Sequence, residues 1–335
     1  MTKTIHEKAP LILAEIKKAK HILLHCHPSP DPDSVGSALA MKFAIEQLGR
    51  KVTLIKGDSD IPEAFVFPGI ETIVNKKFFE IDINDFDLFI ILDSGSKDMI
   101  SKDREVIFPD SLMTIVIDHH VSNKGYGKIN CIESTYPATS QILFHLFKEM
   151  NIEINHDIAL NLFMGIYTDT GGLKYPLTTP ETFKIVGELV SIAPEFTQTI
   201  SIMENSKTKE DLIFLSLVLA SLKTYFSDRF AIASITYEQF LENKINPEDC
   251  SPSEILTILR TVKNFDISVC LTETKPNVIK VGFRSKDSIK FDVSKIAVAI
   301  GGGGHKAASG AHMKNIAILE AIDLVVKKVK EIYNL

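Results

Sequence analysis

Short apolar runs alternate with segments of helical spacing along the first half of the chain. The runs long enough for a buried strand are 22–25 (ILLH), 52–55 (VTLI), 88–92 (LFIIL) and 113–117 (MTIVI). The segments whose apolar positions have the period of a helix are 35–48, 139–150, 156–168 and 180–192. This alternation predicts an α/β fold with a doubly wound, mainly parallel sheet and helices on both of its faces.

The pattern changes in the second half, after segment 209–227, which predicts one long helix. The runs that predict strands there are 230–236, 267–272 and 278–283, and Lys275-Pro276-Asn277 predicts a hairpin turn between the last two. The segments that predict helices are 237–243, 251–263, 292–300 and 316–333. We therefore expect a first domain over 1–190, a helical linker over 191–228 and a second, smaller α/β domain with a mixed sheet over 229–335.

Composition is ordinary for a globular protein, with 45% hydrophobic and 24% charged residues. A net charge of −6 disfavours a protein that coats long nucleic acid, but it allows a small anionic substrate held by a few cations. The four cysteines are far apart and indicate neither a disulfide framework nor a zinc knuckle. The chain has no secretory signal and no apolar run of membrane length, so we expect a cytoplasmic protein with no membrane association.

Acids and histidines follow three of the predicted strands directly. They are His25-Cys26-His27, Asp93 and Asp118-His119-His120. In open parallel sheets the ligand site lies beyond the carboxyl ends of the strands, so we expect these side chains to converge. Asp31 and Asp33 follow in a proline-rich loop that ends in Ser34, an expected helix cap, and Asp169 stands where a helix gives way to glycines.

Each of these residues also has an ordinary interpretation. Asp31 and Asp33 could form turns among the prolines, and Asp93 could be a loop residue or a helix cap. His119 and His120 could form a polar edge, and Asp169 could cap the glycine turn. Together, however, they supply the carboxylates and imidazoles that a pair of divalent cations needs, and they favour manganese or magnesium over structural zinc.

Six sequence elements, in order, resemble a known family. HPSPDPDSVGS, ILDSGS, IDHH and GIYTDTGG resemble the four motifs of the DHH phosphoesterase superfamily. GFRS and GGGGHKAASGA resemble its DHH-associated C-terminal domain. Within the superfamily the chain resembles the NrnA type, a stand-alone oligoribonuclease and 3′-phosphoadenosine 5′-phosphate (pAp) phosphatase related to the RecJ exonucleases.

The resemblance implies a role for each residue of the first domain. His27 and Asp31 would hold one Mn²⁺, and Asp33, His119 and Asp169 would hold a second, with Mg²⁺ as the alternative ion. Asp93 would bridge the two ions. Asp118 would orient an imidazole, and His120 would face the scissile phosphate. His120, Asp93 and Asp118 are thus the expected catalytic residues.

The glycine run 301–304 could be a flexible linker or an anion cradle, because glycine lets backbone N–H groups approach an anion closely. Arg284 could be a solvated charge on a strand or a two-point phosphate ligand. The resemblance assigns substrate binding to the second domain, through Arg284, Ser285, Gly302, Gly303, Gly304 and His305.

The expected activity is hydrolysis of short RNA or DNA oligonucleotides to 5′-mononucleotides, of pAp to AMP, or of both, by water that two metal ions activate. One alternative is a phosphodiesterase of cyclic dinucleotides of the c-di-AMP type, which the motifs do not separate from the first. Another is a nucleotide-binding regulator without catalysis, which would lack a metal ligand. The resemblance is also consistent with a homodimer.

Overall fold

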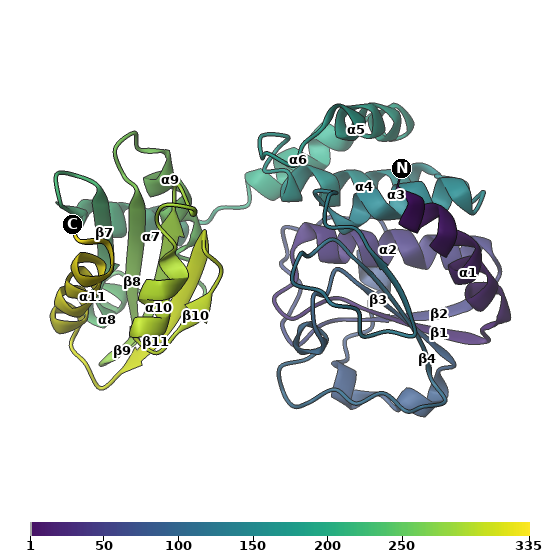
Figure 1. The fold of residues 1–335 in the computed structure, drawn as a ribbon, viewed down its shortest axis with the longest axis horizontal. Coiled ribbons are helices and arrows are strands. Elements are labelled where there is room, and N and C mark those ends of the chain that lie inside the picture. The colour runs from purple at the N-terminus through teal and green to yellow at the C-terminus, as the bar shows by residue number, and fades with distance from the viewer. Residues whose placement is uncertain (1) are drawn as a thin grey trace. The chain divides into compact units, whose positions relative to one another are not determined.

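The computed structural model of the protein describes residues 2–335 and divides into two compact units (Figure 1). The first unit is Met1–Ser206 and the second is Lys207–Leu335. The division falls inside the segment 191–228 that the sequence predicts as a helical linker. Each unit contains one sheet with its own hydrophobic core.

The sheet of the first unit has five parallel strands in the order β2-β1-β3-β4-β5. The strands are β1 (His21–His25), β2 (Lys51–Ile55), β3 (Leu88–Leu92), β4 (Met113–Asp118) and β5 (Ile129–Ile132). The predicted α/β fold with a parallel sheet is confirmed, although the short β5 was not predicted. Because the chain adds β2 on one side of β1 and β4 on the far side of β3, the topological switch point lies between β1 and β3.

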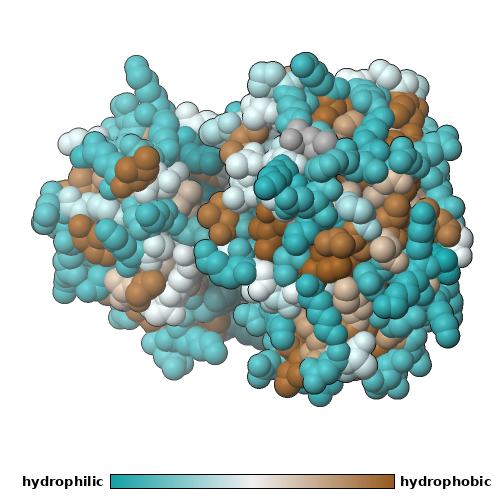
Figure 2. All heavy atoms as spheres, turned by 45° about the vertical axis from the view of Figure 1, so that its right-hand side comes forward, coloured by the Kyte–Doolittle hydropathy of each residue, from teal (hydrophilic) through white to brown (hydrophobic). Residues whose placement is uncertain are grey.

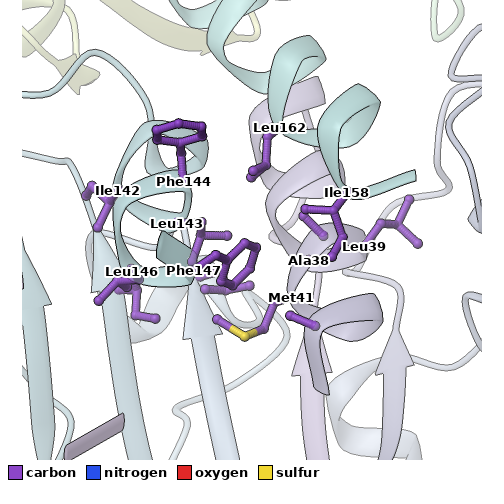
Figure 3. Close-up of a cluster of buried hydrophobic side chains, with 14 of the residues drawn as sticks. Ala38, Leu39, Met41, Ile142, Leu143, Phe144, Leu146, Phe147, Ile158 and Leu162 are labelled. Atoms are coloured by element: carbon purple, nitrogen blue, oxygen red, sulfur yellow. The ribbon is translucent and has the colours of Figure 1, made fainter. Parts of the chain in front are cut away.

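Six α-helices belong to this unit: α1 (Lys3–Lys18), α2 (Pro32–Gln47), α3 (Thr139–Glu149), α4 (His156–Asp169), α5 (Pro180–Ile192) and α6 (Phe196–Glu204). They gather over one face of the sheet (Figure 1). Figure 3 shows side chains of α2, α3 and α4 meeting in the core, among them Met41, Leu143, Phe147 and Ile158. This packing holds α2, α3 and α4 against one another.

The opposite face of the sheet is covered differently from the prediction. Short 3-10 helices and loops lie there instead of α-helices: η1 (Ile70–Thr72), η2 (Phe78–Glu80), η3 (Ile83–Asp85) and η4 (Lys97–Met99). Phe78, Ile100 and Leu112 pack on Leu23 and Phe89 of the strands. Bulky side chains on loops and short 3-10 helices thus bury this face. These segments lack the regular repeat of apolar residues that an amphipathic α-helix needs.

The second unit has a six-stranded mixed sheet in the order β10-β11-β9-β8-β7-β6. Its strands are β6 (Lys223–Tyr225), β7 (Phe230–Ile235), β8 (Ile267–Lys275), β9 (Val278–Ser285), β10 (Gly303–Gly304) and β11 (Ala308–Lys314). β7 and β8 are parallel, and the other neighbours are antiparallel. The predicted mixed sheet and the β8–β9 hairpin are confirmed.

Helices cover both faces of this second sheet. α7 (Lys209–Ala220), α8 (Tyr237–Glu242) and α9 (Ser253–Thr261) pack on one face, whereas α10 (Val293–Ala299) and α11 (Ile318–Tyr333) pack on the other. The single helix predicted over 209–227 was wrong after Ala220. The next residues pair with β7 as β6, and the left-handed residues Phe226, Ser227 and Asp228 turn the chain between the two strands.

Figure 2 shows a face on which hydrophilic side chains predominate and apolar ones lie in small patches. Among residues 2–335, no helix combines the length and the apolar composition needed to cross a bilayer.

Candidate metal centre

His27 and Asp93 lie on either side of the switch point, beyond β1 and β3. The distance from His27 Nε2 to Asp93 Oδ2 is 3.5 Å. The backbone N–H of His27 donates to Ser34 Oγ at 3.0 Å, and its ring Nδ1 lies 3.0 Å from the carbonyl of Pro28. Because Nδ1 donates its proton to that carbonyl, Nε2 is the ring atom directed at the acids.

Asp31 is the N-cap of α2. Its Oδ1 accepts from the backbone N–H of Ser34 at 2.9 Å, and its Oδ2 lies 3.5 Å from His27 Nε2. The prediction that Ser34 caps this helix was therefore wrong. Pro32, in the first turn, has the backbone angle that starts a helix, so the cap falls on Asp31 and the Ser34 hydroxyl is left to hold His27.

Asp33 is fully buried in the first turn of α2 and faces the N-terminus of α3. Its Oδ2 accepts from the backbone N–H of Thr139 at 2.7 Å. Its Oδ1 accepts from the backbone N–H of Ser140 at 3.0 Å and from Ser37 Oγ at 3.3 Å. A carboxylate is stabilised at a helix N-terminus, so α3 holds Asp33 in one orientation.

Asp93 stands in the centre of the cluster. Its Oδ2 faces His27, whereas its Oδ1 lies 3.4 Å from His119 Nε2 and accepts from Thr139 Oγ1 at 3.1 Å. Asp169 Oδ2 lies 3.3 Å from the same His119 Nε2. Asp93 has a left-handed backbone, with φ of 50°, a strained conformation that occurs often at functional sites.

Potential ligand atoms fall into three groups, within each of which they lie no more than 4.8 Å apart. The groups are His27, Asp31 and Asp93; Asp33, His119 and Asp169; and Asp93, His119 and His120. All six residues expected to bind metal thus lie in one place. Asp93 belongs to two of the groups, and its two oxygens face in different directions, which is the geometry of a bridging carboxylate.

The carboxylates of Asp33, Asp93 and Asp169 lie close together and are largely shielded from solvent. Burial, and then the charge of Asp93, raises the pKa of Asp33 to about 7. Burial, and then the charges of Asp33 and Asp93, raises the pKa of Asp169 to about 9. The cluster therefore holds protons unless positive charge is supplied from elsewhere. Divalent cations would supply that charge and displace the protons, so the donor set fits them.

The pKa values of two imidazoles are also raised, but by the neighbouring carboxylates rather than by burial. Burial would lower the pKa of His27, but Asp31 and Asp93 outweigh it and raise the pKa to about 10. For His119 the effect of burial is likewise outweighed, chiefly by Asp93, and the pKa rises to about 10. Protonated histidines thus neutralise part of the acid charge, and they would have to release those protons to bind a metal ion.

His120 stands apart from this pairing. Its Nδ1 lies 2.8 Å from Oδ1 of the buried Asp118, and this hydrogen bond raises its pKa. Asp118 Oδ2 accepts from Asn123 Nδ2 at 2.7 Å, and the same amide donates to the carbonyl of Ser94 at 3.2 Å. With Nδ1 engaged and 40% of the side chain exposed, Nε2 is the ring atom available to an incoming group.

Sequence reasoning did not find Thr139, Ser140 or Asn123. Thr139 and Ser140 begin an apolar helix, where hydroxyl residues are common for capping alone, so their residue types gave no distinct signal. Asn123 lies close after the histidine pair, and an asparagine in a loop is ordinarily a turn residue.

In the second unit, Arg284 lies on β9 opposite Ala308 of β11. Gly304 lies on β10, opposite Ser309 on the other side of β11. Gly303 and Gly304 therefore form a short edge strand, which is a defined conformation rather than that of a free linker. The backbone N–H of His305 donates to the carbonyl of Ala308 at 2.8 Å, which closes the turn between β10 and β11.

Glycine is required at two positions of this run. A Cβ on Gly302 would lie 2.2 Å from the carbonyl oxygen of Gly310, and Gly304 has φ of 133°. Ser285, predicted to bind substrate, is buried, and its hydroxyl has no hydrogen-bond partner within residues 2–335. It lies next to the half-buried Arg284 in the alternating pattern of β9, so its placement does not favour direct contact with a substrate.

Both units match known domain families. Residues 21–166 match the DHH family, N-terminal domain, and residues 230–334 match the DHHA1 domain. The chain therefore has a DHH N-terminal domain followed by a DHHA1 domain. The triplet Asp118-His119-His120 lies inside the first match, as do His27, Asp31, Asp33 and Asp93, whereas Asp169 lies just beyond it. Arg284 and the glycine run lie inside the second.

The chain is similar along most of its length to a curated relative from Streptococcus mutans, named "Probable bifunctional oligoribonuclease and PAP phosphatase NrnA". The two are 26% identical over 321 residues, which cover 93% of this chain and 95% of the relative. A solved exopolyphosphatase-related protein from Bacteroides fragilis has a TM-score of 0.88 at 23% identity, covering 100% of this chain and 99% of that one. RecJ from Thermus thermophilus, solved in complex with Mn²⁺, has a TM-score of 0.54 at 13% identity, covering 98% of this chain and 55% of RecJ. The two solved structures show that the fold is shared.

Proposed function

We propose that this chain is a divalent-cation-dependent phosphoesterase that hydrolyses short oligonucleotides to 5′-mononucleotides, pAp to AMP, or both. The observation that carries the proposal is the position of Asp93, whose Oδ2 faces His27 of one donor group and whose Oδ1 faces His119 of the other. The chain is a hydrolase that acts on phosphoester bonds, as its DHH domain and the curated relative indicate. The activities given in the name of the Streptococcus mutans relative support the choice of oligonucleotides and pAp as substrates.

The residues divide between two ions in the proposal. His27 and Asp31 would hold one, and Asp33, His119 and Asp169 the other, with Asp93 shared. Bound divalent cations would lower the pKa of a water molecule and neutralise charge on the phosphate. Manganese is the ion that we expect, and magnesium is the alternative, since both accept carboxylate and imidazole ligands.

His120 would act on the substrate directly. Its Nδ1 is held by Asp118, so a proton on Nε2 would point toward a phosphate oxygen. The hydrogen bond to Asp118 raises the pKa of His120 and thus favours the protonated ring that donates to an anion. Asn123 would keep Asp118 in place by donating to its second oxygen.

The second unit would bind the end of the substrate away from the scissile bond. Arg284 would contact a terminal phosphate through its planar guanidinium, and His305 together with the N–H groups of 302–304 would bind nearby anionic oxygens. The side chain of Ser285 is buried, so Ser285 would contribute to substrate binding only through its place in the backbone of β9, next to Arg284. These residues would position the substrate without taking part in bond cleavage.

A substrate panel tests the proposal. The purified protein, with Mn²⁺ or Mg²⁺, is offered a two-residue RNA, pAp, a linear and a cyclic dinucleotide, and pyrophosphate. We expect turnover of the RNA or of pAp, and loss of that turnover in Asp93→Asn, which keeps the side-chain shape but removes the charge. Asp103→Asn is the matched control on an exposed acid, with 52% of its side chain accessible. Turnover of the cyclic dinucleotide alone would replace the proposal with the phosphodiesterase alternative, and binding without turnover of any ester would favour the regulator.

A further inference from the structure

A cavity of about 440 Å³ lies at the carboxyl end of β2, in the first unit. Ile61, Phe65, Ile70 and Ile73 form apolar walls, and Lys56 and Asn75 are among its polar lining residues. The strand next to β2 is β1, which leads to His27. The cavity is therefore one strand away from the metal-ligand cluster, and its volume is in the range of small-molecule sites.

The loop that forms the cavity is attached to the loop that carries the metal ligands. The backbone N–H of Cys26 donates to the carbonyl of Ile55 at 3.1 Å, and that of Ser29 donates to Ser59 Oγ at 3.2 Å. A Cβ on Gly57 would lie 2.4 Å from the carbonyl oxygen of His27, so only glycine allows this approach. A group bound in the cavity would thus be held in a fixed relation to the cluster.

The charges around the cavity disfavour an anion. The Lys56 ammonium is paired with Asp60, and Glu63 adds a carboxylate that has no ion pair within residues 2–335. A phosphate would face that carboxylate without a cation to offset it, whereas a neutral group would not. The ring of Phe65 in the apolar wall also stacks on the ring of Phe67, with centroids 5.3 Å apart.

We infer that this cavity binds the nucleobase of a nucleotide whose phosphate lies at the Asp93 cluster, an inference that rests on the proposed function. A nucleobase is the neutral, planar part of a nucleotide, and it can stack on aromatic and apolar side chains. The side chain of Asn75 is exposed and makes no hydrogen bond within the described residues. An asparagine amide can donate to and accept from one edge of an adenine, so Asn75 would read that edge.

Two variants test the inference. Ile61→Trp fills the cavity, and Asn75→Ala removes the amide but keeps the walls. Val66→Trp is the matched control, since Val66 is on the same segment, is 40% exposed and does not line the cavity. KM and kcat are measured for a two-residue RNA and for two analogues of that RNA, each of which lacks one of the two bases.

For the wild type we expect KM to rise about tenfold when one particular base is missing, the scale of one base contact. Ile61→Trp and Asn75→Ala should raise KM for the complete RNA but leave it unchanged for the RNA that lacks that base, because the variant and the missing base remove the same contact. Val66→Trp should behave as the wild type.

Three results would overturn the inference: a wild type indifferent to both missing bases, unchanged KM in both cavity variants, or equal KM increases on all three RNAs for Asn75→Ala. If Ile61→Trp loses activity on every RNA because its fold is damaged, Asn75→Ala decides alone. A wild type that cleaves only pAp is tested in the same way, with pAp and its analogue without the base. A wild type that cleaves neither the RNAs nor pAp would instead contradict the proposed function, so the two failures are distinguishable.

Discussion

Gly165 is a position at which one added atom would disturb the geometry of the cluster. It lies in α4, and a Cβ there would be 2.2 Å from Ser140 Oγ and 2.5 Å from Asp33 Oδ1. Ordinary contacts begin near 3.4 Å, so Gly165→Ala requires Ser140 and Asp33 to move by roughly 1 Å. The variant thus displaces a proposed metal ligand without changing any ligand.

The expected magnitudes follow from two opposing effects. Replacing a helical glycine by alanine gains about 1 kcal/mol, whereas forcing an atom into a packed interior costs about 1–3 kcal/mol. The free energy of unfolding should therefore fall by only about 0–2 kcal/mol. A catalytic group displaced by about 1 Å can cost on the order of 100-fold in rate, so activity should fall far more than stability.

Gly187→Ala in α5 is the matched control, because no atom lies within 4 Å of the Cβ that it would add. Urea unfolding and kcat/KM for a two-residue RNA with Mn²⁺ are measured for both variants. Gly187→Ala should be more stable than the wild type and equally active. If Gly165→Ala keeps its activity within twofold of the wild type, the position of Asp33 does not matter to catalysis and the reasoning is refuted.

Three further predictions concern the surroundings of the cluster. In the metal-free protein, the raised pKa values of Asp169, His27 and His119 mean that the folded chain binds more protons than the unfolded chain from about pH 4 to pH 10, so its stability should fall as pH rises through that window. Because Mn²⁺ has to displace those protons, the gain in Tm on adding Mn²⁺ should be larger at pH 8.5 than at pH 6. An equal gain at the two pH values would count against the assignment. Asn123→Ala should lower kcat by about 10- to 100-fold with little change in KM, because Asp118 loses the donor that orients it, and a change confined to KM would contradict this role. Arg284→Lys should raise KM for pAp and preserve kcat, since lysine lacks the two-point fork, and steady-state kinetics that show a fall in kcat alone would exclude a positioning role.

The order of apolar runs was enough to predict much of the first sheet and the convergence of its ends. Strands β1, β3 and β4 are buried on both faces, so they are continuous apolar runs, and the acids and histidines that follow them were found for that reason. The carboxyl ends of parallel strands meet at one edge, which brings His27 within 3.5 Å of Asp93.

Other features depend on packing between distant segments. The contact of Asp33 with the start of α3 spans 106 positions, and no local pattern encodes it. β10 and β11 contain many small residues and were missed, because glycine and alanine give weak strand signals. The α-helices expected on the second face of the first sheet were not found, since isolated aromatic residues on loops bury it instead.

The central claim is that one cluster of acids and imidazoles holds two divalent cations. Crystals of the protein grown with Mn²⁺, measured for anomalous scattering at the manganese edge, test it most directly. We predict two peaks, one beside His27 and Asp31 and one beside Asp33, His119 and Asp169, with Asp93 between them. A single peak, or peaks away from Asp93, would contradict it.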